Sequence, residues 1–182
     1  MNNPIDDKKF LPISRTCFVC GEDNAAGLGV RFYIEDEAVK VRWRARDQHC
    51  GYDKVVHGGV TAAVLDECMG WAAARAIGRM CLTAELTVRY LRPIPCNREL
   101  TVSTNVTRAA RRLAEVEATL ADDEGIEYAR AQGKFLPLSV EDTLAVDDAL
   151  LYRGDDARLF DSLRTERTAQ SPGVSYCLDT HD

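Results

Sequence analysis

The chain has 182 residues, 46% of them hydrophobic and 29% charged, which is the composition of a globular protein long enough to bury a core in one domain. Its net charge of −6 argues against general nucleic-acid binding, because no basic surplus is available to neutralise phosphates. The polar N-terminus lacks the apolar core of a signal peptide, and no apolar run reaches the ~20 residues of a membrane span, so we expect no membrane partner.

The seven cysteines are odd in number and irregularly spaced, which indicates reduced thiols and a cytoplasmic location rather than a disulfide framework. Cys17 and Cys20 have the spacing of half a zinc site, which Cys50 and His49 would complete. Because a second close pair is missing, we expect the segment around Cys20 to shape an N-terminal loop, with no metal and no cofactor.

Two stretches, residues 30–34 and 39–45, alternate strictly between apolar and polar side chains and predict two strands joined by a turn at residues 35–37. Such alternation is typical of an antiparallel sheet that buries one face. The outward face of the second strand is expected to be solvated rather than to form a binding track; it carries Lys40, Arg42, Arg44 and Arg46.

After a loop over residues 47–56, the glycine pair Gly58 and Gly59 begins a helix that ends near Gly78. This helix is apolar on every side, so it should be largely buried, yet it contains the adjacent acids Asp66 and Glu67. A carboxylate in an apolar site must be paired, hydrogen-bonded or raised in pKa, and a raised pKa suits a general base. The free N–H groups at the helix start are suited to stabilise an oxyanion.

Four long strands follow at about residues 81–92, 98–108, 112–122 and 126–137, with short connections that predict antiparallel neighbours. A buried helix between two early and four later strands predicts an α+β fold in which a curved antiparallel sheet wraps the helix. We expect an N-terminal extension at residues 1–16, a domain at 17–138 and a C-terminal extension at 139–182. In that last extension, residues 143–152 and 155–164 have weak helical periodicity and residues 165–182 form a mobile tail.

Five segments in this order resemble hotdog-fold acyl-CoA thioesterases of the phenylacetyl-CoA-pathway type over residues 17–137. They are Cys17-Phe18-Val19-Cys20-Gly21, Asn24-Ala25-Ala26-Gly27-Leu28, the His57-Gly58-Gly59 helix start followed by Asp66, Tyr90-Leu91-Arg92-Pro93, and Arg111-Arg112.

The resemblance implies three catalytic positions. The Gly58 N–H polarises the thioester carbonyl, Asp66 activates water or attacks directly, and Thr83 helps to orient the water. The sequence departs from the family at Gly51, where many relatives have a polar residue; Gln48 or His49 would replace it if the loop is shifted.

Other residues are candidate substrate contacts. Arg111 and Arg112, with Arg108 nearby, lie in the region that the family places near the nucleotide of coenzyme A, although such a cluster also suits a solvated hairpin end. His57 and Gly59 shape the helix entrance. Glu67 is the rival of Asp66 as catalyst, but lies ~100° further round the helix and should not share its direction.

Each catalytic assignment has a structural alternative. Asp66 would otherwise be a structural acid paired with a buried arginine, and Thr83 an ordinary strand threonine.

Gly58 and Asp66 are eight residues apart, which is about 12 Å along one helix and too far to reach one reacting carbon. Two subunits related by a twofold axis would assemble the site, and the resemblance likewise implies a homodimer or a dimer of dimers. The sequence therefore favours hydrolysis of an acyl-CoA thioester to free acid and CoA. Hydration or dehydration of an acyl thioester on the same fold uses a paired His and Glu motif, which this sequence does not show. The main alternative is a non-catalytic acyl-CoA-binding module that acts through a partner.

Overall fold

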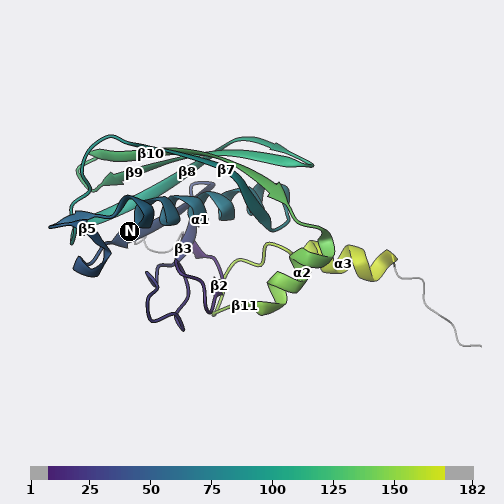
Figure 1. The fold of residues 1–182 in the computed structure, drawn as a ribbon. Helices are drawn as coiled ribbons and strands as arrows, with labels where there is room; N and C mark the ends of the chain where they lie inside the picture. Colours follow the sequence, from purple (N-terminus) through teal and green to yellow (C-terminus); the bar gives the residue numbers. More distant parts are fainter. Residues whose placement is uncertain (1–7, 171–182) are drawn as a thin grey trace, which may run out of the picture.

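A seven-stranded antiparallel sheet covers one face of a 20-residue helix in the computed structural model, which describes residues 8–170 (Figure 1). The strand order is β1-β3-β4-β8-β9-β10-β7. In that order the strands span Lys9–Phe10, Phe32–Glu35, Ala38–Arg44, Glu99–Ala110, Leu113–Asp122, Glu127–Pro137 and Cys81–Tyr90. The α+β architecture predicted from the sequence, a hotdog fold, is confirmed.

Helix α1 (Gly58–Ile77) lies against the inner face of this sheet and ends at Gly78, whose φ of 74° is in the left-handed region that glycine adopts without strain. Its buried side chains meet the inward side chains of β4, β8, β9 and β10, so the alternating strand pattern and the apolar helix form one core. The central contributors from the helix are Val64, Leu65, Cys68 and Met69, each with 0% exposure.

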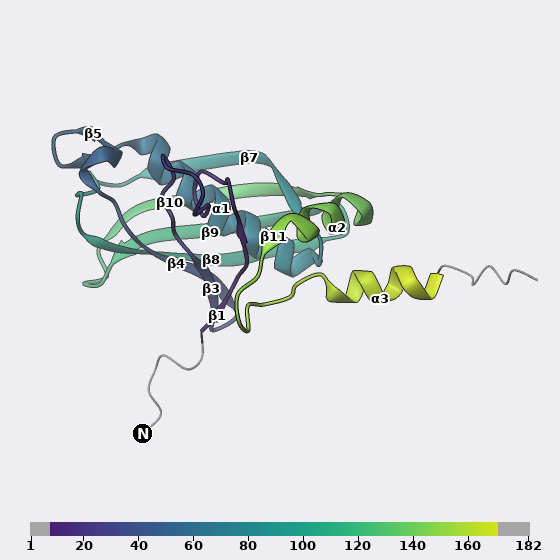
Figure 2. The ribbon, with the colours of Figure 1, turned by 90° about the horizontal axis from the view of Figure 1, so that it is seen from below.

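A second layer covers the side of α1 that faces away from the sheet (Figures 1 and 2). It is built from β2 (Ile13–Ser14), β11 (Leu150–Leu151), which pairs with β2, and α2 (Val140–Ala149). Both terminal segments therefore contribute to the structure around α1: β1 adds a strand to the main sheet, and Leu11, Ile13 and Phe160 are buried in the common core. A helix that is apolar on every side requires such a second cover.

The C-terminal helices differ from the sequence-based prediction in their boundaries. Helix α2 begins three residues earlier than expected because the Ser139 hydroxyl accepts a hydrogen bond from the Asp142 amide at 3.0 Å and caps it. Helix α3 (Asp161–Gln170) begins six residues later, after the buried Phe160, and projects away from the body (Figure 2). Residues 165–170 are therefore helical rather than part of a mobile tail, and the rest of that predicted tail lies outside the described residues.

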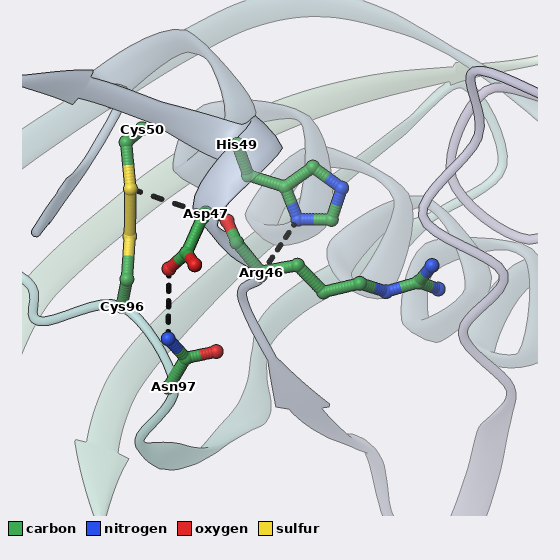
Figure 3. Close-up of a disulfide and its surroundings, with 6 residues drawn as sticks. All are labelled: Arg46, Asp47, His49, Cys50, Cys96 and Asn97. Atoms are coloured by element: carbon green, nitrogen blue, oxygen red, sulfur yellow. Dashed lines mark hydrogen bonds between the residues drawn. A yellow bond between two sulfur atoms is a disulfide. The ribbon is translucent and has the colours of Figure 1, made fainter.

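The loop before α1 contains a 3-10 turn (Asp47–His49) and the hairpin of β5 (Cys50–Tyr52) and β6 (Val55–Val56). Its Cys50 forms a disulfide with Cys96, so the expectation that all cysteines are reduced is wrong (Figure 3). The two cysteines are 46 residues apart and meet because Val55 bridges to Pro95 and the Cys96 amide donates to the Lys54 carbonyl at 3.0 Å.

The disulfide removes the cysteine argument for a cytoplasmic location. Between residues 8 and 170, no helix combines the length and the apolar character that crossing a bilayer requires.

Candidate functional site

A cavity of about 330 Å³ lies between α1, the start of β7 and the second layer. Residues from four separate parts of the chain line it, and both terminal segments contribute to its wall. The lining residues are Ser14, Cys17, Cys20, Asp66, Glu67, Gly70, Trp71, Met80, Cys81, Thr83, Val146 and Leu150.

Asp66 and Thr83 form a hydrogen-bonded pair in the wall of this cavity. Thr83 is directly opposite Phe135 in the sheet, and Phe135 is buried beneath α1, so the Thr83 side chain also points toward the helix. Its hydroxyl donates to Asp66 Oδ1 at 2.9 Å. Burial raises the pKa of Asp66, and the hydrogen bond from Thr83 opposes this shift. The partner of Asp66 is therefore a strand hydroxyl and not a buried arginine.

Glu67 lines the same cavity but has different partners. Its Oε2 is joined to Cys17 Sγ by a hydrogen bond of 2.9 Å. Burial raises the pKa of Glu67 to about 8, whereas the hydrogen bond with Cys20 lowers the pKa of Cys17 to about 5. As expected, Glu67 does not share the direction of Asp66, since its partner is in the N-terminal loop rather than on β7, although both acids line the cavity.

The loop that carries Cys17 and Cys20 brings both sulfur atoms to Glu67, and the three ligand atoms lie within 4.8 Å of one another. Cys50 and His49, which the sequence offered as the complement of these cysteines, lie elsewhere. Cys50 is in the disulfide, and the ring of His49 points away from it with Nδ1 accepting from the Arg46 amide at 3.1 Å (Figure 3).

The start of α1 is held by two side chains. His57 caps the helix, since its Nδ1 accepts from the Gly59 amide at 2.9 Å, and Tyr90 donates from its hydroxyl to the Gly58 carbonyl at 2.6 Å. At the first helical position, the Gly58 N–H has no acceptor within the helix. Gly51 packs against His57, where an added Cβ would lie 3.1 Å from the ring, so this position is occupied by backbone rather than by a polar side chain.

One chain does not bring the catalytic candidates together. Gly58 is absent from the lining of the cavity that contains Asp66 and Thr83. Arg111 and Arg112 are exposed in the turn between β8 and β9 and do not line this cavity either. The carbonyl of Arg111 accepts from Arg79, which follows the C-terminal end of α1, the end opposite Gly58.

Sequence reasoning missed several cavity residues. Val146 and Leu150 belong to α2 and β11, and no local pattern indicates that these elements fold back over α1. The pairing of Cys17 and Cys20 with Glu67 was also missed, although their spacing had marked the two cysteines. The role of Tyr90 in fixing the Gly58 carbonyl requires the position of β7 relative to the helix.

Comparison with known proteins gives consistent matches. The thioesterase superfamily profile matches residues 53–129, which include α1 and the strands from β7 into β10. The thioesterase superfamily protein RHA08564 is 28% identical, with a TM-score of 0.62 over 67% of this chain and 60% of that one. The chain thus spans less than two thirds of the length of that relative, and no curated protein matches it significantly.

Two further solved structures share the fold at lower identity. The Escherichia coli PaaI protein from the phenylacetic acid degradation operon is 18% identical, with a TM-score of 0.57 over 62% of this chain and 81% of that one. A hypothetical thioesterase from Streptococcus pneumoniae with coenzyme A is also 18% identical, with a TM-score of 0.54 over 58% and 84% of the two chains.

Proposed function

Because the chain belongs to the thioesterase superfamily of hotdog-fold proteins, we propose that it hydrolyses an acyl-CoA thioester to a free acid and CoA. The observation that carries this proposal is Asp66, a half-buried carboxylate hydrogen-bonded to Thr83 in the wall of a cavity. A binding module would not require an acid inside an apolar helix, since burial of a carboxylate is costly. That the Streptococcus pneumoniae relative was solved with coenzyme A supports a CoA ester as the substrate.

In the proposed reaction, Asp66 removes a proton from a water molecule as its oxygen attacks the thioester carbon. The carbonyl oxygen becomes an oxyanion, which the free N–H of Gly58 stabilises at the start of α1. The C–S bond then breaks, and the proton held by Asp66 passes to the departing CoA sulfur. Thr83 keeps Asp66 in position through its hydrogen bond.

The oxyanion donor comes from a second subunit. Strand β7 is an edge strand whose described neighbour is β10, and most of its residues are exposed. An unpaired edge of ten residues readily pairs with another strand, so an antiparallel contact between two β7 strands supports a homodimer. A twofold axis there would bring Gly58 of one subunit toward Asp66 of the other, and a dimer of dimers would add a second interface.

The remaining candidates have supporting roles. His57 engages the Gly59 amide and leaves the Gly58 N–H as the oxyanion donor. Glu67 lies in the part of the cavity that would receive the acyl group. Arg111 and Arg112 are exposed and are proposed to contact the phosphates of CoA, for which the planar guanidinium is well suited.

Release of free thiol from a panel of acyl-CoA esters tests the proposal. The wild-type protein should turn over at least one ester, and Asp66→Asn should bind that ester without comparable turnover. Stoichiometric binding of acyl-CoA by the wild-type protein with no thiol release from any ester would instead identify the non-catalytic binding module.

A further inference from the structure

The cluster of Cys17, Cys20 and Glu67 takes no chemical step in the proposed hydrolysis, although Glu67 lies in the part of the cavity that would receive the acyl group, and its geometry is specific. Two sulfur atoms from the N-terminal loop and a carboxylate oxygen from α1 lie within 4.8 Å of one another. The residues come from positions 17, 20 and 67, so their convergence is a property of the fold and not of local sequence. All three line the cavity that also contains Asp66 and Thr83.

The backbone around the two sulfur atoms is arranged as a cradle. The Val19 amide donates to Cys17 Sγ at 3.2 Å, and the Ser14 amide donates to Cys20 Sγ at 3.4 Å. Such N–H donors stabilise thiolate, which is the form of cysteine that binds metal. In the metal-free chain this form is favoured at Cys17, whereas the hydrogen bond with Cys17 raises the pKa of Cys20, so metal must displace the Cys20 proton. The loop packs closely at Gly21 and leaves no room for a side chain there, because an added Cβ would lie 2.4 Å from the Cys17 carbonyl oxygen.

Although the spacing of the cysteines alone favoured a loop without metal, we propose that Cys17, Cys20 and Glu67 bind a zinc ion whose fourth coordination position opens into the cavity. Two thiolates and a carboxylate suit Zn²⁺ better than Ca²⁺ or Mg²⁺, because soft sulfur ligands select soft metals. A zinc site with three protein ligands retains one position for water or for a polar group of the bound molecule.

The distances require little movement. Tetrahedral zinc separates two sulfur ligands by about 3.8 Å and a sulfur from an oxygen by about 3.6 Å. The 4.8 Å limit of the cluster accommodates both values, and the 2.9 Å separation of Cys17 Sγ and Glu67 Oε2 would lengthen by roughly 0.7 Å. Binding replaces this hydrogen bond and releases the protons held by the cluster to solvent.

Titration of the metal-free full chain with Co²⁺, the spectroscopic substitute for zinc, tests the site. We expect a sulfur-to-cobalt charge-transfer band and intense visible bands of tetrahedral cobalt. Elemental analysis of the protein as isolated, before the metal is removed, should find one zinc per chain. Cys17→Ser should weaken binding by at least ~100-fold, because one of three ligands is lost. The matched control is Cys81→Ser: Cys81 lines the same cavity but is outside the cluster, so this variant should bind cobalt as the wild-type protein does.

Far-ultraviolet circular dichroism verifies that each variant folds, and Glu67→Gln provides a second test that leaves both cysteines intact. The proposal fails if cobalt binds without the charge-transfer band, if Cys17→Ser and Glu67→Gln bind as tightly as wild type, or if mass spectrometry of the isolated protein finds a disulfide between Cys17 and Cys20. The cobalt spectrum is recorded without any acyl-CoA. Failure of the proposed zinc site can therefore be distinguished from failure of the proposed hydrolysis.

Discussion

At the scale of single residues, two adjacent acids on one helix have different partners, and the roles proposed for them differ for that reason. Asp66 accepts a hydrogen bond from a hydroxyl on β7, the strand at the exposed sheet edge, whereas Glu67 meets the sulfur of Cys17 in the N-terminal loop. One position along the helix therefore separates a carboxylate next to the proposed subunit interface from a carboxylate next to the proposed metal.

Asp66→Asn should reduce the turnover of acyl-CoA by at least ~100-fold while the protein stays folded, because the isosteric amide cannot accept the proton of water. Steady-state kinetics with the best ester of the panel measure the loss, and the melting temperature checks the fold. Near-normal turnover in this variant, or a comparable loss confined to Glu67→Gln, would show that Asp66 is not the catalyst.

Thr83→Val should lower kcat by about tenfold, because the isosteric side chain fills the same space but no longer donates to the Asp66 carboxylate. Thr83→Ser, which restores the hydroxyl, should recover most of the activity. If Thr83→Val and Thr83→Ser are equally active, the hydroxyl has no role in catalysis.

His49 should make folding stability dependent on pH. Burial, with a smaller effect of Arg46, lowers the pKa of His49, and its Nδ1 accepts a hydrogen bond from the Arg46 amide. The folded state therefore favours neutral imidazole, so stability is present above the unfolded pKa of about 6.5 and is lost as the pH falls below it. Urea unfolding at pH 7.5 and 5.5 should show a larger loss in wild type than in His49→Asn, which keeps an acceptor but does not titrate.

His57→Asn is the matched control for this measurement. Asparagine is a good helix cap, His57 is exposed, and His49 remains in place, so the pH dependence should persist. Equal pH dependence in wild type and His49→Asn would exclude His49 as its source.

At the scale of elements, periodicity predicted the helix and the long strands well, because each buries one face with a regular spacing. The expected helix end near Gly78 and the four strands after it agree with α1, β7, β8, β9 and β10 to within a few residues. The second layer was not predicted, since β2 and β11 are two residues each and derive their conformation from pairing across the fold.

The same limit applies to the candidate site. The carboxylate of Asp66 stood out because an acid interrupts an apolar pattern, which is a local signal. The disulfide of Cys50 and Cys96 and the convergence of Cys17 with Glu67 depend on contacts between segments 46 and 50 residues apart. Spacing along the chain does not contain that information.

The second layer should limit the length of the acyl group. Leu150 lines the cavity from β11, so Leu150→Ala should enlarge it and shift the ratio of kcat/KM for a longer over a shorter ester by about tenfold or more toward the longer one. Leu151→Ala is the control, because Leu151 is next on the same strand but does not line the cavity. An unchanged ratio in Leu150→Ala would show that the acyl group does not reach this wall.

At the scale of the whole molecule, the described chain has the features of half an active site. Thr83 and Tyr90 lie on an exposed edge strand, and Gly58 and Asp66 are separated by about 12 Å of helix. The proposed twofold axis would account for both facts at once, since it would cover the edge and place the helix start of one subunit toward the acid of the other.

Two inactive variants should therefore restore activity when combined. A Gly58→Val subunit still supplies Asp66, although the larger side chain meets the Tyr90 hydroxyl and disturbs the helix start, where a Cβ would already lie 3.3 Å from that oxygen. An Asp66→Asn subunit still supplies an intact helix start. Each heterodimer then holds one complete site, and random pairing of equal amounts gives about half heterodimer, so activity should approach roughly a quarter of wild type.

Co-expression with two different affinity tags allows the heterodimer to be isolated, which avoids slow exchange across a buried interface. Each homodimeric variant, purified in the same way, sets the background rate. The expected result is that the tagged heterodimer has about half the wild-type activity per dimer, since one of its two sites is complete. If a proven heterodimer is as inactive as its parents, Gly58 and Asp66 act within one chain, and a monomer with full activity would refute the shared site directly.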